Sequence, residues 1–130
     1  MTARIDMCKS KGFDGIDPDN IDGYANDTGL PLTAQDQLNY NIFLAAIAHA
    51  RGLAAGLKND TGQVATLFKY FDWELNEECF TYDECDTLLP FINAGKPVFN
   101  IEYELTTPEF CPQANAMNFN SLKKNLSLNA

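Results

Sequence analysis

The sequence lacks any run of eighteen apolar residues, so it contains no candidate for a membrane-spanning helix. Basic residues are scarce, with nine Lys and Arg against eighteen Asp and Glu, which gives a net charge of −9. This balance argues against nucleic acid and against an anionic membrane as partners, because both require a basic surface. A cationic or neutral ligand is easier to reconcile with it, although acidity can also serve solubility alone.

Signatures of metal and cofactor binding are also missing. The single histidine, His49, falls inside a helical pattern, and the cysteines Cys8, Cys79, Cys85 and Cys111 do not form paired C-x-x-C motifs. No G-x-G-x-x-G motif follows a predicted strand, so a dinucleotide site is unsupported. We therefore expect no metal and no cofactor. Cys79 and Cys85 frame the loop "CFTYDEC", which a disulfide could close.

What is present is the composition of one globular domain. The 130 residues are 45% hydrophobic and include nine Phe and five Tyr. Short apolar segments predict strands, and longer segments with helical periodicity lie between them. The N-terminal "RIDMCKSKG" resembles the end of a helix, and "MTARIDMCKSKG" has no apolar signal-peptide core. The predicted strands are 13–17, 53–60, 72–78, 96–104 and 119–126, and the predicted helices are 33–52, 62–71, 82–95 and 107–118.

The first of these helices has the clearest boundaries. Thr33 is a suitable N-cap, and Gly52 is a suitable stop. The face expected to be buried carries Leu38, Ile42, Ala45 and Ala46, and Leu44, Ile47 and Ala48 widen it, so the helix is expected to be largely covered.

Strands that alternate with helices predict a parallel sheet with right-handed crossovers. The possible folds are an open doubly wound sheet and a (β/α)8 barrel. Polar, acidic segments follow four strands: "DPDN", "KND", "NEE" and "EYE". In a barrel these ends meet at the C-terminal face, where active sites lie. Because only five strands are present, we predict that residues 1–130 are the last five β/α units of a (β/α)8 TIM barrel, with an open five-stranded sheet as the alternative.

The acidic segment "DPDNIDGY" raises the question of what its aspartates bind. The spacing of an EF-hand calcium loop fails, because Ile21, Asp22 and Thr28 occupy positions 5, 6 and 12. Pro18 disfavours a helical conformation for Asp17, so Asp17 and Asp19 are expected to point to the same side of an extended chain. Two such carboxylates repel each other unless a cation, a proton or a substrate amine lies between them.

Glycoside hydrolysis requires two carboxyl groups that face each other across the glycosidic bond. The segment "WELNEEC" offers Glu77 as a partner from another strand end. Aromatic side chains could stack on a sugar ring, although a lone aromatic is more often a core residue, the interpretation we favour for Trp73. The other candidate platforms are Tyr24, Tyr82 and Tyr103. Further candidate binding residues at the strand ends are Lys58, Asn59, Asp60, Glu102, Tyr103 and Glu104.

Four segments in this order and spacing resemble glycoside hydrolase family 114: "GFDGIDPDNIDGYANDTGLPLT", "GLKND", "DWELNEECFTYDEC" and "KPVFNIEYE". The resemblance covers residues 4 to 124. It implies a (β/α)8 barrel with the activity of an endo-α-1,4-polygalactosaminidase, secreted by fungi or bacteria. The family's N-terminal strands have no counterpart in this sequence, so the chain is expected to be a monomer or to pair with the missing N-terminal half.

The resemblance also implies roles for individual residues. Asp19 and Glu77 correspond to the catalytic carboxylates, with retention of configuration and Asp19 as the nucleophile. Asp17 is then a binding or pKa-tuning carboxylate, and the Cys79–Cys85 pair resembles a disulfide. A deacetylated galactosamine polymer carries ammonium groups that the acidic rim would attract. The remaining substrate-binding candidates are Asn20, Asp22, Tyr24 and Asn76. The alternatives are a non-catalytic binder of cationic glycans and an inactive barrel fragment.

Overall fold

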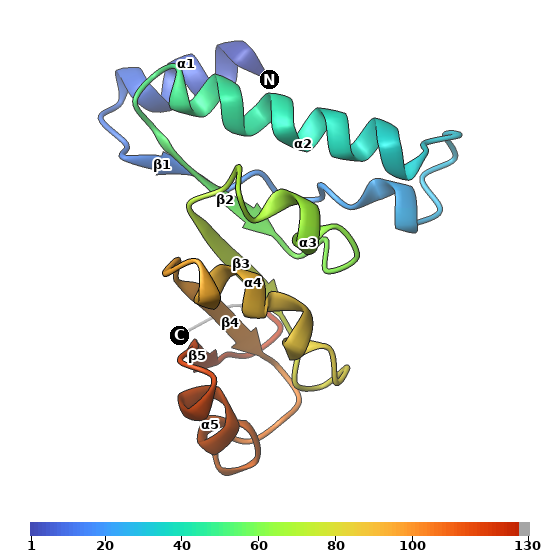
Figure 1. Ribbon diagram of the computed structural model, residues 1–130, viewed down its shortest axis with the longest axis vertical. Coiled ribbons are helices and arrows are strands. Elements are labelled where there is room, and N and C mark those ends of the chain that lie inside the picture. Colours follow the sequence, from blue (N-terminus) through green and yellow to red (C-terminus); the bar gives the residue numbers. More distant parts are fainter. Residues whose placement is uncertain (128–130) are drawn as a thin grey trace.

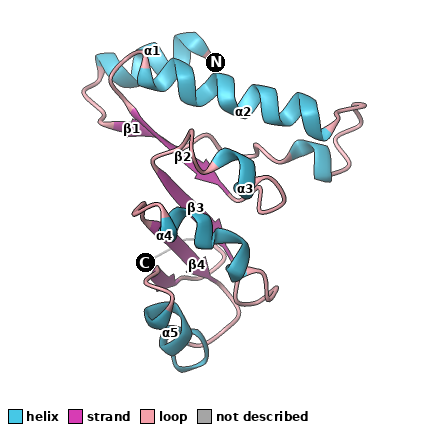
Figure 2. Ribbon diagram, in the orientation of Figure 1, coloured by secondary structure: helices cyan, strands magenta, loops and turns pink. Residues whose placement is uncertain are grey.

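A computed structural model describes residues 1–127, and the last three residues of the predicted domain lie outside this part. Helices and strands alternate along the chain (Figure 2). The strands are β1 (Gly15–Ile16), β2 (Ala54–Lys58), β3 (Trp73–Glu77), β4 (Val98–Glu102) and β5 (Asn120–Lys123). The α-helices are α1 (Thr2–Ser10), α2 (Ala34–His49), α3 (Val64–Leu67), α4 (Leu89–Asn93) and α5 (Thr107–Ala116), and short 3-10 helices span Gly23–Ala25 and Cys85–Leu88.

The five strands form one parallel sheet in chain order, β1-β2-β3-β4-β5. A doubly wound sheet reverses its strand order at a switch point, whereas a barrel adds each strand beside the previous one. Right-handed crossovers then place the helices on the same side of the sheet. Figure 1 shows the helices following one another along the sheet, with α2 beside β1 and β2 and α5 beside β5. The prediction of a partial (β/α)8 barrel is therefore confirmed.

The strand register gives the sheet two unlike faces. On the helix-covered face, Leu57 of β2 pairs with Glu74 of β3, which pairs with Val98 of β4, and none of these three is exposed. Leu57 and Val98 belong to one core cluster with buried residues of the helices, such as Leu44 of α2 and Phe91 of α4. The molecule thus has its core between the sheet and the helices.

The opposite side, which we call the open face, carries large apolar side chains that are only partly covered. Phe99 is 41% exposed and Leu122 is 57% exposed. Together with Trp73, Leu75 and Ile101 they line a cavity of about 540 Å³. This face corresponds to the interior of a barrel, which in a closed (β/α)8 fold is filled by side chains from all the strands.

Helix α2 begins as predicted, and its buried stripe includes the expected Leu44, Ala45 and Ala48 but also two residues that were not expected. The Thr33 hydroxyl accepts a hydrogen bond from the Asp36 amide at 3.1 Å, and the Asp36 carboxylate accepts one from the Thr33 amide at 3.0 Å. The buried residues are Gln37, Asn41, Leu44, Ala45 and Ala48, whereas Ala46 is exposed. Two amides therefore face the core, a placement that an apolar-periodicity argument cannot predict.

The predicted helices 62–71 and 82–95 were too long. The first is reduced to α3, and the second is divided into a 3-10 turn and α4. Pro90 explains the division, because proline lacks a backbone N–H and is accommodated in the first turn of a helix. Short crossover helices leave long connections after β2 and β3, and these connections carry several of the polar residues described next.

Candidate active site

Three neighbouring strands bring their carboxyl ends together at one edge of the sheet. The segment after β1 carries Asp19, β2 ends at Lys58, and β3 ends at Glu77. The Lys58 ammonium donates a hydrogen bond to Asp19 Oδ1 at 3.3 Å and a second one to Glu77 Oε2. Because one ammonium contacts both groups, the two acceptor oxygens lie within about 6 Å of each other. The two predicted carboxylates thus face each other across Lys58.

Glu77 is held by three further interactions. The Tyr103 hydroxyl donates to Glu77 Oε1 at 2.5 Å, and the Asn59 amide group lies 3.5 Å from Oε2. The Asn59 side-chain carbonyl accepts a hydrogen bond from the Glu77 backbone N–H at 2.8 Å, which fixes the end of β3 against the end of β2. The structure thus places Tyr103 and Asn59, two of the predicted binding residues, in contact with Glu77.

These contacts determine the protonation of the site. Partial burial alone would raise the pKa of Glu77, but the hydrogen bonds from Lys58 and Tyr103 outweigh it and hold this pKa below its ordinary value. Burial opposes the charged form of Lys58, yet Glu77 and Asp19 raise its pKa above the usual value. Burial, together with the hydrogen bond to Glu77, raises the pKa of Tyr103 to about 12. In the free protein Glu77 is ionised and Lys58 is charged.

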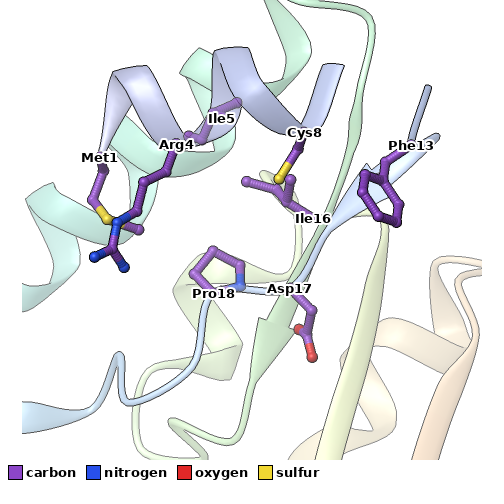
Figure 3. Close-up of a pocket in the computed structure, with 9 residues that line it drawn as sticks. Met1, Arg4, Ile5, Cys8, Phe13, Ile16, Asp17 and Pro18 are labelled. Atoms are coloured by element: carbon purple, nitrogen blue, oxygen red, sulfur yellow. The ribbon is translucent and has the colours of Figure 1, made fainter. Parts of the chain in front are cut away.

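Asp17 lies on the open face, close enough to Lys58, Asp19 and Glu77 for their charges to affect it. Figure 3 shows Ile16 directed towards α1 and Asp17 directed to the opposite side, as expected for successive residues of a strand. A Cβ atom at Gly56 would lie 2.7 Å from Asp17 Oδ1 and would overlap the Trp73 indole, so Gly56 is needed for this packing. Desolvation by these neighbours, with smaller contributions from Asp19 and Glu77, raises the pKa of Asp17 to about 6 against the opposing effect of Lys58.

This packing refines the interpretation of Trp73 as a core residue. The indole is half-buried on the open face, over Gly15 and Gly56, so it belongs to the interior of the barrel and not to the core beneath the helices. It supports the Asp17 carboxylate rather than the helices.

Two adjoining cavities lie at this edge. The first, which we call the cleft cavity, has a volume of about 430 Å³ and is lined by Asp19, Asn20, Lys58 and Glu77 among others. The second, which we call the side cavity, has about 240 Å³. Asp22, Asn59 and Glu77 line both of them, so the two cavities are neighbours. The side cavity is further lined by Tyr24, Ala25, Asp60, Thr61, Gly62, Tyr82 and Glu84.

Asp60 is the buried acid of the side cavity. It is only 2% exposed, and its Oδ2 atom accepts a hydrogen bond from Asn41 at 2.9 Å. The Asn41 side-chain oxygen in turn accepts a hydrogen bond from the Gln37 amide at 2.9 Å. The two buried amides of α2 therefore form a chain of hydrogen bonds that ends at Asp60. Burial, reinforced by the charge of Asp22, raises the pKa of Asp60 to about 7, although hydrogen bonds from Tyr24 and Asn41 oppose this shift.

Five of the predicted binding residues line neither cavity: Asp17 and Tyr103, described above, and Asn76, Glu102 and Glu104. Asn76 is 1% exposed, and its side-chain oxygen accepts a hydrogen bond from the Cys79 backbone N–H at 2.9 Å. Glu102 is fully buried and accepts hydrogen bonds from the Phe80 N–H at 3.0 Å and the Thr81 hydroxyl at 2.8 Å. Both residues hold the loop after β3, and Glu104 is exposed without lining either cavity.

Several residues that line the cavities were not predicted from the sequence. Asn26 and Thr28 line the cleft cavity, and Thr61, Gly62 and Glu84 line the side cavity. All five lie in connections beyond the strand ends rather than at the ends themselves. The segment "NDTG" occurs twice, at 26–29 and at 59–62, and its composition is typical of turns. Because the loops that follow barrel strands carry site residues, this repeat could have identified Asn26, Thr28, Thr61 and Gly62.

The predicted disulfide is present. Cys79 and Cys85 are bonded, with Cα atoms 4.8 Å apart, whereas Cys8 and Cys111 are free. The bond closes the loop that carries Tyr82 and Glu84, and the Thr61 hydroxyl donates to Glu84 at 3.3 Å. The loop after β3 is therefore attached to the core at one end and to the loop after β2 at the other.

Two carboxylates that face each other at the carboxyl edge of a β/α barrel are the arrangement typical of a glycoside hydrolase. A family model described as glycoside-hydrolase family GH114 matches residues 1–130, and the chain belongs to this family. The comparison with curated proteins gave no match.

A solved structure agrees with this assignment. The crystal structure of Aspergillus fumigatus Ega3 in complex with galactosamine superposes with a TM-score of 0.92 at 43% sequence identity. The match covers 99% of this chain and 57% of the Ega3 chain. This chain thus spans little more than half the length of that relative. Within residues 1–127, none of the helices has the length and apolar character needed to cross a membrane.

Proposed function

We propose that this chain is the C-terminal part of a single glycoside hydrolase barrel domain that cleaves α-1,4-linked polymers of galactosamine and N-acetylgalactosamine. The observation that carries the proposal is the contact of one ammonium, that of Lys58, with both Asp19 and Glu77. Galactosamine in the Ega3 crystal structure supports an amino sugar as the substrate unit. The family resemblance supports an endo-acting polygalactosaminidase.

In this proposal Asp19 is the nucleophile and Glu77 is the acid/base. A separation within about 6 Å between their nearest oxygens favours retention, because inverting enzymes need room for a water molecule between the carboxyl groups. The Lys58 ammonium donates a hydrogen bond to Asp19 Oδ1 at 3.3 Å, which helps to orient this carboxylate. The side chain of Asp19 is 68% exposed, so a sugar can reach it.

Glu77 must be protonated before it can donate a proton to the glycosidic oxygen. Its pKa is low in the free protein because Lys58 and Tyr103 both donate hydrogen bonds to it. A sugar placed between Asp19 and Glu77 would move Lys58 away from Glu77 and exclude water, and both changes raise the pKa of a carboxyl group. Asp17 adds a negative charge nearby, which favours the protonated form of Glu77 when Asp17 is ionised.

The reaction then balances in two steps. Asp19 attacks the anomeric carbon and forms a covalent glycosyl ester, while the proton of Glu77 passes to the oxygen of the leaving sugar. Water then attacks the same carbon, Glu77 takes up its proton, and the ester bond to Asp19 breaks. No cofactor or metal enters this scheme. The polymer partner is a cationic or neutral glycan, and the chain acts as a monomer in the extracellular space.

The test is the release of reducing ends from partly deacetylated α-1,4-galactosaminan. It should be run with the 130-residue chain alone and with a complete barrel, made by joining the chain to the part of Ega3 that it does not span. We expect turnover in the complete barrel and a loss of at least about a thousandfold in Asp19→Asn and Glu77→Gln, since each removes a group that acts in the transition state.

Different results point to the competing functions. Salt-sensitive binding of the polymer by a folded complete barrel without turnover would identify a non-catalytic binder of cationic glycans. Turnover by the complete barrel but not by the chain alone would identify the chain as an inactive fragment. Full activity in both variants would refute the assignment of the two carboxylates.

A further inference from the structure

Helix α2 carries a pair of exposed aromatic rings on the side that is turned away from the sheet. Tyr40 is 42% exposed and Phe43 is 48% exposed. Their ring centroids lie 6.3 Å apart and their planes differ by 27°, so the two rings are nearly parallel. Each other ring contact among the described residues involves a buried ring, that of Phe91, Phe110 or Phe119. The Tyr40–Phe43 pair, which we call the aromatic platform, is therefore distinct from the packed rings of the core.

The aromatic platform and the active site lie on opposite sides of the same helix. Asn41 is completely buried, and its amide group donates a hydrogen bond to Asp60 at 2.9 Å. Asp36, Tyr40 and Phe43 are exposed, and their spacing of four and three residues places them along one outer stripe. Since an α-helix with its side chains is about 10–12 Å across, the thickness of one helix separates the platform from the active site.

Closure of the barrel would leave the platform on the surface. The missing strands would extend the sheet at its two free edges, β1 and β5, and their helices would join the outer ring beside α1 and α5. Helix α2 already contacts a neighbour on each flank, α1 on one side and α3 on the other. Figure 1 shows α2 lying across β1 and β2, with no free flank for a further helix. The rest of the barrel therefore does not account for the exposed rings.

The surroundings of the platform are polar and carry no lysine or arginine. Residues 34–49, which form α2, include neither of these residue types. The exposed carboxylate of Asp36 precedes Tyr40 by one turn, and the exposed Gln35 amide donates a hydrogen bond to the Asn39 side chain at 2.9 Å. Since the whole chain has a net charge of −9, this surface repels anions and attracts cations.

The size of the platform suits a sugar chain better than a protein. A stable protein interface buries at least about 1,200 Å² in total, which two half-exposed rings within a polar surface do not provide. An aromatic ring offers a flat apolar surface on which the apolar face of a sugar can stack, and it also attracts organic cations. Nearby amide and carboxylate groups can bind hydroxyl and ammonium groups.

We propose that the aromatic platform of α2 is a second binding site for the polymer, outside the cleft, where Tyr40 and Phe43 stack on an amino sugar of a cationic glycan. The identity of this glycan as a galactosamine polymer rests on the proposed function. A polymer bound at both places would be held at the cleft at a raised effective concentration. The platform touches no reacting atom, so it serves polymer binding and not bond cleavage.

The test measures the binding of partly deacetylated α-1,4-galactosaminan at pH 7 and constant ionic strength. In NMR spectra of the chain alone, the polymer should shift the signals of Tyr40 and Phe43, and an anionic galacturonan should not. Calorimetry with the complete barrel is run in the Glu77→Gln background, so that the polymer stays intact. Replacing both rings, Tyr40→Ala with Phe43→Ala, should weaken binding at least about fivefold.

Two further variants serve as controls. Tyr40→Phe keeps both rings and should bind as the parent protein does. Leu30→Ala removes an apolar side chain that is 67% exposed and lines neither cavity, so it should leave binding unchanged. Unchanged binding after loss of both rings, or an equal loss in Leu30→Ala, overturns the inference. Signals of Tyr40 and Phe43 that shift with protein concentration alone would identify a contact between two copies of the chain and would also overturn it.

Kinetics distinguishes this inference from the proposed function. In the active complete barrel, loss of both rings should raise KM for the polymer severalfold and affect kcat little, as expected when binding is lost outside the reacting centre. If the polymer is cleaved with the same KM in this variant, the platform is wrong and the hydrolase stands. If loss of the rings weakens polymer binding but the complete barrel cleaves no bond, the hydrolase is wrong and the platform stands.

Discussion

The helix-covered face and the open face of the same sheet differ in how completely the chain itself buries their side chains. On the first, Leu57 and Val98 are completely buried by residues of the chain itself. On the second, Phe99 and Leu122 remain largely exposed. The free edge beside β1 adds a mostly apolar pocket of about 290 Å³, lined by Ile5, Ile16 and other residues (Figure 3).

This difference shows that local β/α packing is complete in this chain while the interior of the barrel is not. Each strand and its helix can pack without the remaining units. The polar site, however, is built at the edge where the two faces meet, so its residues depend on both. Asn41 and Asp60 belong to the helix-covered side, and Asp17 and Trp73 belong to the open side.

The largest expected effect is on the free energy of unfolding, and it is tested with two phenylalanines, one on each face of the sheet. Phe91→Ala, on the helix-covered side and 0% exposed, should lower the free energy of unfolding by about 3–5 kcal/mol, because it leaves a cavity in the core. Phe99→Ala, 41% exposed on the open face, should change it by less than about 1 kcal/mol. Urea denaturation of the chain measures both, and similar losses would mean that the open face is covered in solution.

The second prediction, of intermediate size, is the pH dependence of the free energy of unfolding. Burial raises the pKa of Asp60 from 3.8 to about 7 and raises that of Glu74 as well, so folding favours their protonated forms. The stability that protonated Asp60 contributes is complete below about pH 4 and is lost as the pH rises through about 7. For Asp60 the loss is on the order of 2 kcal/mol, given about 1.4 kcal/mol per pKa unit and allowing for relaxation.

Thermal unfolding between pH 4.5 and 8 measures this slope. Asp60→Asn should flatten it, whereas Asp17→Asn, at an exposed position on the open face, should flatten it less. An unchanged slope in Asp60→Asn would show that Asp60 is solvated and ionised.

The smallest effect tests the helix that covers β2. Thr33→Ala removes the acceptor for the Asp36 amide at the start of α2 and should cost about 1 kcal/mol of unfolding free energy. Thr33→Ser keeps the acceptor and should restore most of it. Equal losses in the two variants, in the same urea titration, would rule out the cap as the cause.

The sequence was sufficient to predict the strand order, the cap of α2 and the meeting of Asp19, Lys58 and Glu77, because parallel strands in series bring their ends to one edge. The sequence was insufficient where the role of a residue depends on which face of the sheet its side chain occupies. Glu102 and Asn76 follow the same pattern as Glu77 but lie on the helix-covered face, where they hold a loop. Asn41 and Glu84 were missed because their positions depend on contacts between segments far apart in the chain.

The bond between Cys79 and Cys85 links the shape of the side cavity to the redox state of the surroundings. The loop it closes holds Tyr82 and Glu84 at the side cavity. In a reducing compartment this loop would lose its covalent tie, and these two side chains would be held less firmly. This wall of the side cavity is therefore expected to be best ordered in an oxidising environment, where disulfides persist.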